Sequence, residues 1–242
     1  METSMGTTSF LSLSGAVIEM NGTTVCKYSP DPSIWERLNE QAIYMSECGM
    51  PFVEVLGMAH GRYWLREYAP LRITNLPITL ATAKESLEPL WDVENPRHIP
   101  VNWVTAHQSR LRELCKINGI ESVLHTLLLK FEEVVDNWYR LTVCGATHGD
   151  ATLSNIVIDV PKSQIRWIDP IPPSLWLPAF KAIDLAKLLQ SAHGWEHFLN
   201  NQPPPSYADD VVLKDESPVD VMAARYFHMS GQKGDASVIH VL

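Results

Sequence analysis

The sequence predicts an α+β protein of two lobes, with a small antiparallel β-sheet and one helix over residues 1–69 and a mainly α-helical lobe over residues 70–242. Two patterns predict this division. The first 70 residues alternate apolar and polar positions between turn signals, as short strands do. From residue 121 onward, the apolar residues recur at helical spacing instead. We therefore expect the sheet to precede most of the helices along the chain.

The first lobe is predicted to hold short strands that are separated by recognisable turns. Asn21-Gly22 is a hairpin signal, and His60-Gly61 marks a second turn between two apolar segments. Gly49 and Pro51 end the one helix that the spacing predicts here. The expected strands cover residues 9–20, 23–29, 52–56 and 62–68, and the expected helix covers residues 34–48.

Helices dominate the second lobe. Residues 70–100 are rich in proline, so we expect a connection there with one short helix near residues 83–88. A helix over residues 121–139 carries an apolar stripe that marks its core-facing side. Two short strands are expected over residues 155–159 and 164–168, further helices over residues 182–193 and 219–229, and a loop around the prolines at 203–205.

Composition indicates a globular protein and argues against several partners. The 242 residues are 45% hydrophobic and 19% charged, with a formal net charge of −9, so neither nucleic acid nor an anionic membrane is an expected partner. No segment approaches the ~18 apolar residues of a membrane span, and no signal-peptide pattern opens the chain. The four cysteines form no CxxC pair, and the histidines show no zinc-binding spacing. We expect a cytoplasmic protein with reduced thiols.

The most informative segment is residues 147–158, followed by residues 167–170. Asp150 and Asn155 lie five residues apart in a loop after an apolar segment, and Asp169 follows 14 residues beyond Asn155. A tight hairpin returns its second strand beside the start of the first, so Asn155 and Asp169 can approach each other. Mg²⁺ takes one or two protein oxygens together with phosphate oxygens. The pattern therefore predicts a magnesium-nucleotide site, with Asp150 facing a reacting hydroxyl.

The motif HGD-x4-N followed by IDP resembles the catalytic loop and metal motif of the aminoglycoside phosphotransferase and choline kinase family, small-molecule relatives of protein kinases. Residues 182–190, AIDLAKLLQ, resemble the helix that follows in that family. Upstream, Lys27 in VCK resembles the nucleotide lysine, and Glu40 fits the helix glutamate that pairs with it. Residues 64–69 resemble the hinge at the adenine pocket. Covering residues 10–195, the resemblance implies a two-lobed protein-kinase-like fold.

The resemblance also implies the chemistry. ATP and Mg²⁺ are the expected cofactors, and a small hydroxylated molecule is the expected acceptor. The implied catalytic residues are Asp150, which would accept or orient the acceptor's proton, and Asn155 and Asp169, which would also hold Mg²⁺. The implied nucleotide-binding residues are Lys27, Glu40, Glu67, Tyr68 and Ala69, the last three through backbone groups beside adenine.

Other residues near the motif have expected roles or depart from the family. His148 and Asp184 are expected to brace the catalytic loop, and Trp176, in a proline-rich insert after the metal motif, is a candidate substrate contact. No glycine-rich loop precedes Lys27, and the nearest candidate, residues 12–15, has one glycine. Phosphate contact from that loop is therefore not expected to be strong.

The leading functional hypothesis is an ATP-dependent phosphotransferase acting on a sugar, an amino alcohol or an aminoglycoside-like molecule. The segment LLQSAHGWE is similar to kinase-like proteins encoded with polysaccharide and sugar-nucleotide pathways, which favours a sugar. Two alternatives stay open. One is a degenerate kinase fold that binds a nucleotide or a partner without transfer, which the missing glycine-rich loop suggests. The other is a protein kinase, against which HGD in place of HRD counts.

Overall fold

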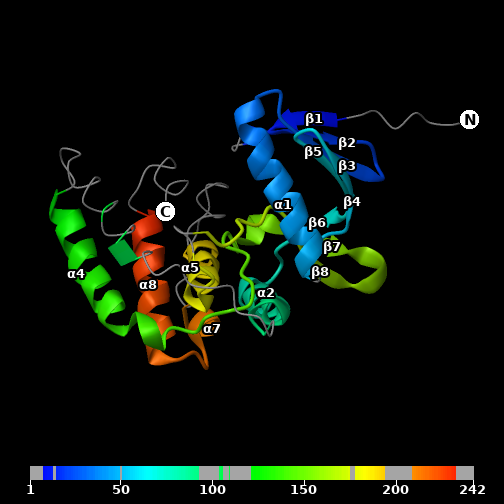
Figure 1. Ribbon diagram of the computed structural model, residues 1–242. Helices are drawn as coiled ribbons and strands as arrows, with labels where there is room; N and C mark the ends of the chain where they lie inside the picture. Colours follow the sequence, from blue (N-terminus) through cyan, green and yellow to red (C-terminus); the bar gives the residue numbers. More distant parts are fainter. Residues whose placement is uncertain are drawn as a thin grey trace, which may run out of the picture. The chain divides into compact units, whose positions relative to one another are not determined.

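The computed structural model describes residues 8–12, 15–49, 51–92, 104–105, 109, 121–174, 178–193 and 209–232 (Figure 1). The chain divides into two compact units. The first unit consists of Met1–Arg72 and Asn155–Pro172, and the second consists of Ile73–Ser154 and Pro173–Leu242. The segment that follows the catalytic loop thus groups with the N-terminal sheet.

An antiparallel sheet of five strands makes up most of the first unit. Its strands are β1 (Thr8–Leu11), β2 (Val17–Met20), β3 (Thr24–Tyr28), β4 (Val55–Ala59) and β5 (Arg62–Arg66). They lie in the order β1-β2-β3-β5-β4. Asn21 closes the β2–β3 hairpin, because its Oδ1 accepts the N–H groups of Thr23 and Thr24. The segment predicted as one strand over residues 9–20 is two strands, since the chain turns back between Ser12 and Ala16.

One long helix, α1 (Trp35–Cys48), accompanies this sheet. A short 3₁₀ turn, Pro32–Ile34, precedes it, and Asp31 caps that turn by accepting the N–H of Ser33. The helix ends at Gly49, whose φ of 64° lies in the left-handed region that glycine adopts readily. Its buried residues recur at helical spacing and are Leu38, Gln41, Ala42, Tyr44 and Met45.

Three strands form a second antiparallel sheet in the first unit. They are β6 (Ala69–Pro70), β7 (Ile156–Asp159) and β8 (Gln164–Trp167), in the order β6-β7-β8. Trp167 is fully buried, and its backbone bonds to Pro51 and Val53, just before β4. The predicted β7–β8 hairpin is confirmed and is tied by these bonds to the N-terminal part of the same unit.

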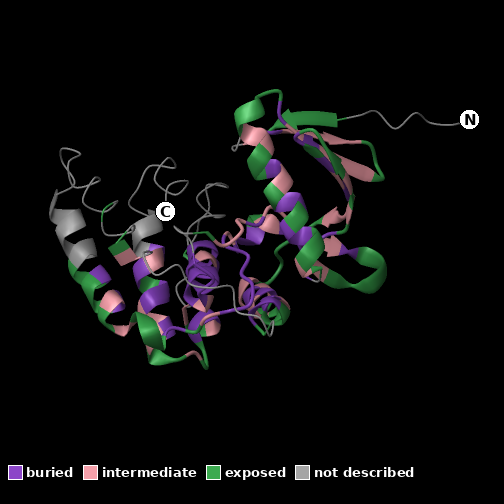
Figure 2. Ribbon diagram, in the orientation of Figure 1, coloured by how far each residue is buried: buried purple, intermediate pink, exposed green. Residues whose placement is uncertain are grey.

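Helices form the second unit: α2 (Leu76–Trp91), α4 (Glu121–Asn137), α5 (Lys181–Ala192), α7 (Asp209–Leu213) and α8 (Pro218–Gln232). Figure 2 shows α5 as an almost continuously buried helix. Ten of its 12 residues are buried, and it packs against α2, α7 and α8. The core of the second unit is therefore built around α5.

Short 3₁₀ turns occur at Trp138–Arg140, Leu153–Asn155 and Val160–Lys162.

Two helices depart from the sequence prediction. Helix α2 is much longer than residues 83–88, because Asn75 caps its start by accepting the N–H of Ile78. Pro77 lies in the first turn, where a missing N–H is tolerated. Helix α7 lies in a part of the chain for which the sequence predicts no helix. In the part of the chain that is described, no helix has both the length and the apolar character to cross a membrane.

Candidate active site

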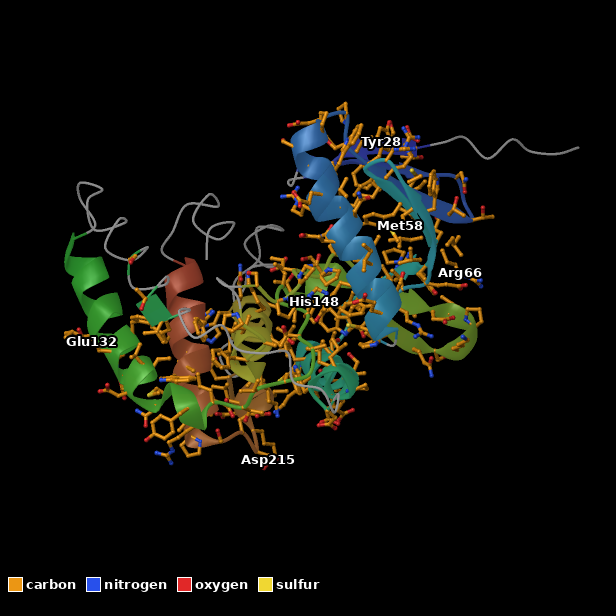
Figure 3. The ribbon with its side chains drawn as sticks, in the orientation of Figure 1. Tyr28, Met58, Arg66, Glu132, His148 and Asp215 are labelled. Carbon is orange, nitrogen blue, oxygen red and sulfur yellow. The ribbon has the colours of Figure 1, made fainter. Side chains whose placement is uncertain are left out.

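A fully buried carboxylate, Asp184 on α5, holds the loop that carries the HGD motif (Figure 3 labels His148). Its Oδ1 accepts the N–H of Gly149 at 2.8 Å, and its Oδ2 accepts the N–H of His148 and the indole N–H of Trp91, both at 3.0 Å. Burial raises the pKa of Asp184 to about 6, although the three hydrogen bonds act in the opposite direction. These contacts match the predicted bracing role of Asp184.

Asp150, the predicted catalytic residue, follows directly after this anchor. Its backbone N–H donates to His148 Nδ1 at 3.2 Å, and its carbonyl oxygen accepts the N–H of Thr152 at 2.8 Å. The carboxylate is 31% exposed, and its Oδ1 lies 2.9 Å from Nζ of Lys187 on α5. Both the backbone and the side chain of Asp150 are thus held in place, and its carboxylate is partly accessible to solvent.

In the first unit, the predicted nucleotide lysine meets the predicted metal-binding aspartate. Nζ of Lys27 lies 2.6 Å from Oδ1 of Asp169, although 142 residues separate them along the chain. Tyr63 donates its hydroxyl to the same oxygen at 3.4 Å. Burial, followed by the charge of Asp169, raises the pKa of Tyr63 well above its ordinary value. The Lys27 side chain is only 5% exposed, so this ammonium depends on Asp169 as its charge partner.

Glu40 does not reach Lys27. It lies on the exposed side of α1, and no ion pair joins these two described residues. The next residue, Gln41, is buried instead: its Nε2 donates to the carbonyl oxygen of Pro170 at 2.9 Å, and its Oε1 is buried without a hydrogen-bond partner. The expected Lys27–Glu40 ion pair is therefore not formed, because the phase of the helix turns Gln41 inward and Glu40 outward.

Asp169 fits the role of a magnesium ligand. Lys27 and Tyr63 both bond to Oδ1, so within the described part of the chain Oδ2 has no hydrogen-bond partner, and the side chain is 30% exposed. The carbonyl oxygen of Asn155 accepts the N–H of Ile168 at 2.9 Å. The hairpin therefore holds the backbone of Asn155 beside the residue that precedes Asp169. Asp169 also has a φ of 56°, a conformation that strains a non-glycine residue and often marks a functional site.

The predicted hinge, residues 67–69, links β5 to β6. The N–H of Glu67 already donates to the carbonyl oxygen of Thr23 at 3.0 Å, so this amide is not available to a nucleotide base. Hinge residues line a cavity of about 310 Å³ whose lining residues are Glu54, Arg66, Glu67, Tyr68, Ala69, Ile158, Asp159, Val160, Pro161 and Lys162. Lys27 and Asp169 do not line this cavity, so it is distinct from the position of their ion pair.

Some predicted features lie outside the described residues. They are Trp176, the candidate substrate contact, and residues 13 and 14 of the segment nearest to a glycine-rich loop. The proline-rich loop at 203–205 also lies outside them.

Three residues of the site are not identified by the motifs. Gln41 is buried on the same stripe of α1 as Leu38 and Met45, and this helical phase is a signal that could have found it. Lys187 lies one helical turn after Asp184, so it projects from the same face of α5 toward the HGD loop. Tyr63 has only the alternation of a strand as its signal, which does not indicate contact with a residue as distant in sequence as Asp169.

The sequence matches no family model and no curated protein. Solved structures, by contrast, show clear similarity. An aminoglycoside phosphotransferase from Streptomyces rimosus matches with a TM-score of 0.60 and 14% identity, over 94% of this chain and 92% of that chain. An ethanolamine kinase from Plasmodium vivax matches with a TM-score of 0.56 and 16% identity, over 92% of this chain and 72% of that chain. A choline kinase from Streptococcus pneumoniae matches with a TM-score of 0.54 and 13% identity, over 98% and 89%.

At these identities the similarity establishes the fold. The chain has the α+β, two-lobed, protein-kinase-like fold, and this prediction is confirmed. The suspected resemblance to aminoglycoside phosphotransferases and choline kinases is confirmed at the same level. The Streptomyces rimosus enzyme also matches as a complex with ADP and streptomycin, with a TM-score of 0.57 and 12% identity, over 94% of this chain and 92% of that chain.

Proposed function

We propose that this protein is an ATP-dependent phosphotransferase that moves the γ-phosphoryl group of ATP to a hydroxyl of a small molecule. One observation carries the proposal: Lys27 and Asp169, for which the family resemblance implies the nucleotide lysine and the metal-binding aspartate, lie 2.6 Å apart despite their separation of 142 residues. The anchoring of the HGD loop by Asp184 gives further support, because it fixes the backbone beside Asp150.

In this proposal, residues 1–69 form the nucleotide-binding lobe and residues 70–242 form the catalytic and acceptor-binding lobe. Lys27 binds oxygens of the α- and β-phosphates, while Asp169 and Asn155 are the protein ligands of the metal. Mg²⁺, when bound, would supply positive charge that stabilises the charge of the phosphates. Gln41 holds the backbone of the residue after Asp169, and through it the conformation of the metal motif.

The transfer step needs orientation and charge stabilisation more than covalent chemistry by the protein. The acceptor hydroxyl loses its proton to the carboxylate of Asp150 as its oxygen forms a bond to the γ-phosphorus. The bond between that phosphorus and the β,γ-bridging oxygen breaks, and ADP leaves with the bonding electrons. Asp150 then returns the proton to solvent. The partial exposure of its carboxylate supports this role.

The structural neighbours indicate which acceptors to test first. Structural neighbours include proteins named for aminoglycosides, ethanolamine and choline, and all of these molecules carry hydroxyl groups. The similarity of LLQSAHGWE to proteins of sugar-nucleotide pathways adds sugars to the set. We therefore propose a polyol or amino-alcohol acceptor, with sugars, choline, ethanolamine, streptomycin and gentamicin as the first panel of candidates.

The experiment that tests the proposal separates binding from transfer. Mg-ATP binding is measured by calorimetry for the wild type, Asp169→Asn and Asp150→Ala, and phosphate transfer to the panel is followed by ³¹P NMR. We expect Asp169→Asn to weaken metal-dependent binding at least tenfold, because it replaces an ionised metal ligand. We expect Asp150→Ala to bind Mg-ATP as the wild type does but to transfer at least 100-fold more slowly. Absence of Mg-ATP binding by the wild type at millimolar ATP would refute the proposal.

The same measurements address the two alternatives. A degenerate kinase fold would bind the nucleotide without transferring phosphate to any acceptor, and the absence of a glycine-rich pattern before Lys27 is the feature that favours it. A protein kinase would label mixed protein substrates in preference to the small-molecule panel. Transfer to a small hydroxylated molecule excludes the first alternative, and a preference for such molecules over proteins excludes the second.

A further inference from the structure

A lysine from outside the motif contacts the predicted catalytic carboxylate. The motif itself, residues 148–155, contains no lysine or arginine. Lys187 on α5 nevertheless places its Nζ 2.9 Å from Oδ1 of Asp150. The Lys187 side chain is 17% exposed and that of Asp150 is 31% exposed. This ion pair is therefore more shielded than an ordinary surface pair, and its two charges interact more strongly than they would in bulk water.

The helix that supplies Lys187 also supplies the loop anchor. Asp184, one helical turn earlier, accepts the backbone N–H groups of His148 and Gly149. Helix α5 is otherwise buried, and its only two residues that are not buried are Lys181 and Lys187. Since a buried helix has little freedom to shift, one rigid element fixes both the backbone of the HGD loop and the carboxylate that the loop presents.

We propose that Lys187 is a positioning residue for phosphoryl transfer: it keeps Asp150 ionised and fixes the orientation of its carboxylate toward the acceptor hydroxyl. This inference rests on the proposed function. Lys187 takes no part in the proton transfer, because the acceptor's proton goes to Asp150. Its positive charge favours the ionised carboxylate of Asp150, the form that can accept a proton.

Among the described residues, charged or titratable side chains contact Asp150 or interact with its charge. Lys187 is the cation, and Asp184, on the same helix, is a carboxylate whose charge interacts with that of Asp150. His148 contacts the backbone of Asp150 through its Nδ1. Asp184 acts on Asp150 as a like charge, and a like charge favours the protonated carboxyl, which Lys187 counteracts. Protonated Asp150 could not accept the proton of the acceptor.

The experiment compares Lys187→Met and Lys187→Arg with a matched control on the same helix. Lys181→Met is the control, since Lys181 also forms an ion pair, with Glu216 at 2.8 Å, but has no contact with the HGD loop. For each variant, calorimetry measures Mg-ATP binding, and release of ADP with the acceptor panel, or with water as the acceptor, gives kcat between pH 5 and 9. The ¹³C chemical shift of the Asp150 carboxyl, assigned with Asp150→Asn, reports its protonation without any need for turnover.

We expect Lys187→Met to bind Mg-ATP within about threefold of the wild type and to lower kcat about 10- to 100-fold. The acid limb of its pH–rate profile and the ¹³C titration of Asp150 should both move about one unit to higher pH. Lys187→Arg should restore most of the activity and the wild-type acid limb. Lys181→Met should lower thermal stability without moving either pH dependence.

Outcomes that contradict the inference are distinct from those that contradict the proposed function. A loss of kcat in Lys187→Met with an unchanged acid limb and an unchanged Asp150 titration would mean that Lys187 has only a structural role. Equal shifts in Lys187→Met and Lys181→Met would mean the same. If the wild type binds no Mg-ATP, the proposed function fails, and the ¹³C titration still decides whether Lys187 controls the ionisation of Asp150.

Discussion

Replacing Asp184 by asparagine tests how the HGD loop is held. The substitution keeps the shape of the side chain but removes its charge and one hydrogen-bond acceptor. In the wild type, Oδ1 serves Gly149 and Oδ2 serves both His148 and Trp91. An amide has only one acceptor oxygen, so its NH₂ group must face either the N–H of Gly149 or the two donors on the other side. At least one buried donor is left without a partner.

Two effects of opposite sign set the magnitude. Burial raises the pKa of Asp184 from 3.8 to about 6, a difference of about two pH units, which corresponds to about 3 kcal/mol that the ionised group costs the native state. The amide avoids this cost. Each buried donor left unsatisfied costs about 1–3 kcal/mol in return. At pH 7 the free energy of unfolding should therefore change by less than about 2 kcal/mol, while the loop loses a tie beside Asp150 and transfer slows.

The pH dependence is the sharper signature. Between pH 6 and 4, native Asp184 takes up a proton that the unfolded chain does not bind, so lowering the pH stabilises the wild type through this group. Raising the pH through 6 removes that stabilisation. Asp184→Asn lacks the group entirely. The free energy of unfolding of the wild type minus that of the variant should thus grow by up to about 3 kcal/mol as the pH falls from 7 to 4.

Urea unfolding of both proteins at intervals from pH 4 to 8 measures this difference. Asp215→Asn, at an exposed turn that Figure 3 labels, makes the same chemical change without burial and serves as the control. Hydrogen exchange at the amides of His148 and Gly149 should accelerate in Asp184→Asn alone. If the difference between wild type and Asp184→Asn stays flat over this range, or grows as the pH rises, the desolvation of Asp184 is not what sets its energetics.

Two further predictions concern stability. In Gly61→Ala the new Cβ would lie 2.1 Å from the Trp35 ring, at a residue whose φ is 73°. We expect the free energy of unfolding, measured in urea, to fall by at least about 2 kcal/mol. A fall below about 0.5 kcal/mol would show that the Trp35 ring moves aside at little cost. The side chain of Glu216 is 5% exposed and pairs with Lys84 at 2.7 Å and with Lys181 at 2.8 Å. Because both lysines retain some access to solvent, Glu216→Gln should lower the free energy of unfolding by about 1–3 kcal/mol. An unchanged melting temperature would contradict this.

Local patterns predicted the elements whose signals are contained within a few residues. The helix expected over residues 34–48 is α1 (Trp35–Cys48), because its apolar spacing and the glycine at its end define it without help from the rest of the chain. The β7–β8 hairpin and helices α4, α5 and α8 were found in the same way. Helix α2 was underestimated, because Pro77 stands in its first turn, where a missing N–H is tolerated, and the helix continues through Pro89 near its end.

Contacts between distant residues could not be read from the sequence. The error at Glu40 came from choosing a residue by its chemistry, since the stripe Leu38, Ala42 and Met45 already turns Gln41 inward. The ion pair of Lys187 with Asp150 has no local signal, because a lysine beside a helical aspartate is common on solvated surfaces. Only the packing of α5 against the rest of the second unit makes it a partner of the HGD loop.

The Lys27–Asp169 ion pair suggests how the proposed nucleotide binding avoids a large electrostatic penalty. Removing an ammonium or a carboxylate from water is costly unless a partner of opposite charge replaces the water. Lys27 is already buried against Asp169 before any ligand binds, so its desolvation is complete in the ligand-free protein. In the proposed function, Lys27 would exchange a carboxylate for phosphate oxygens, and Asp169 would exchange an ammonium for a metal ion. Each group keeps a partner of opposite charge, so the free energy of binding reflects the difference between two paired states. Asp169→Asn would remove both the charge partner of Lys27 and the charged ligand of the metal. It should therefore weaken metal-dependent binding more than the loss of one ligand alone.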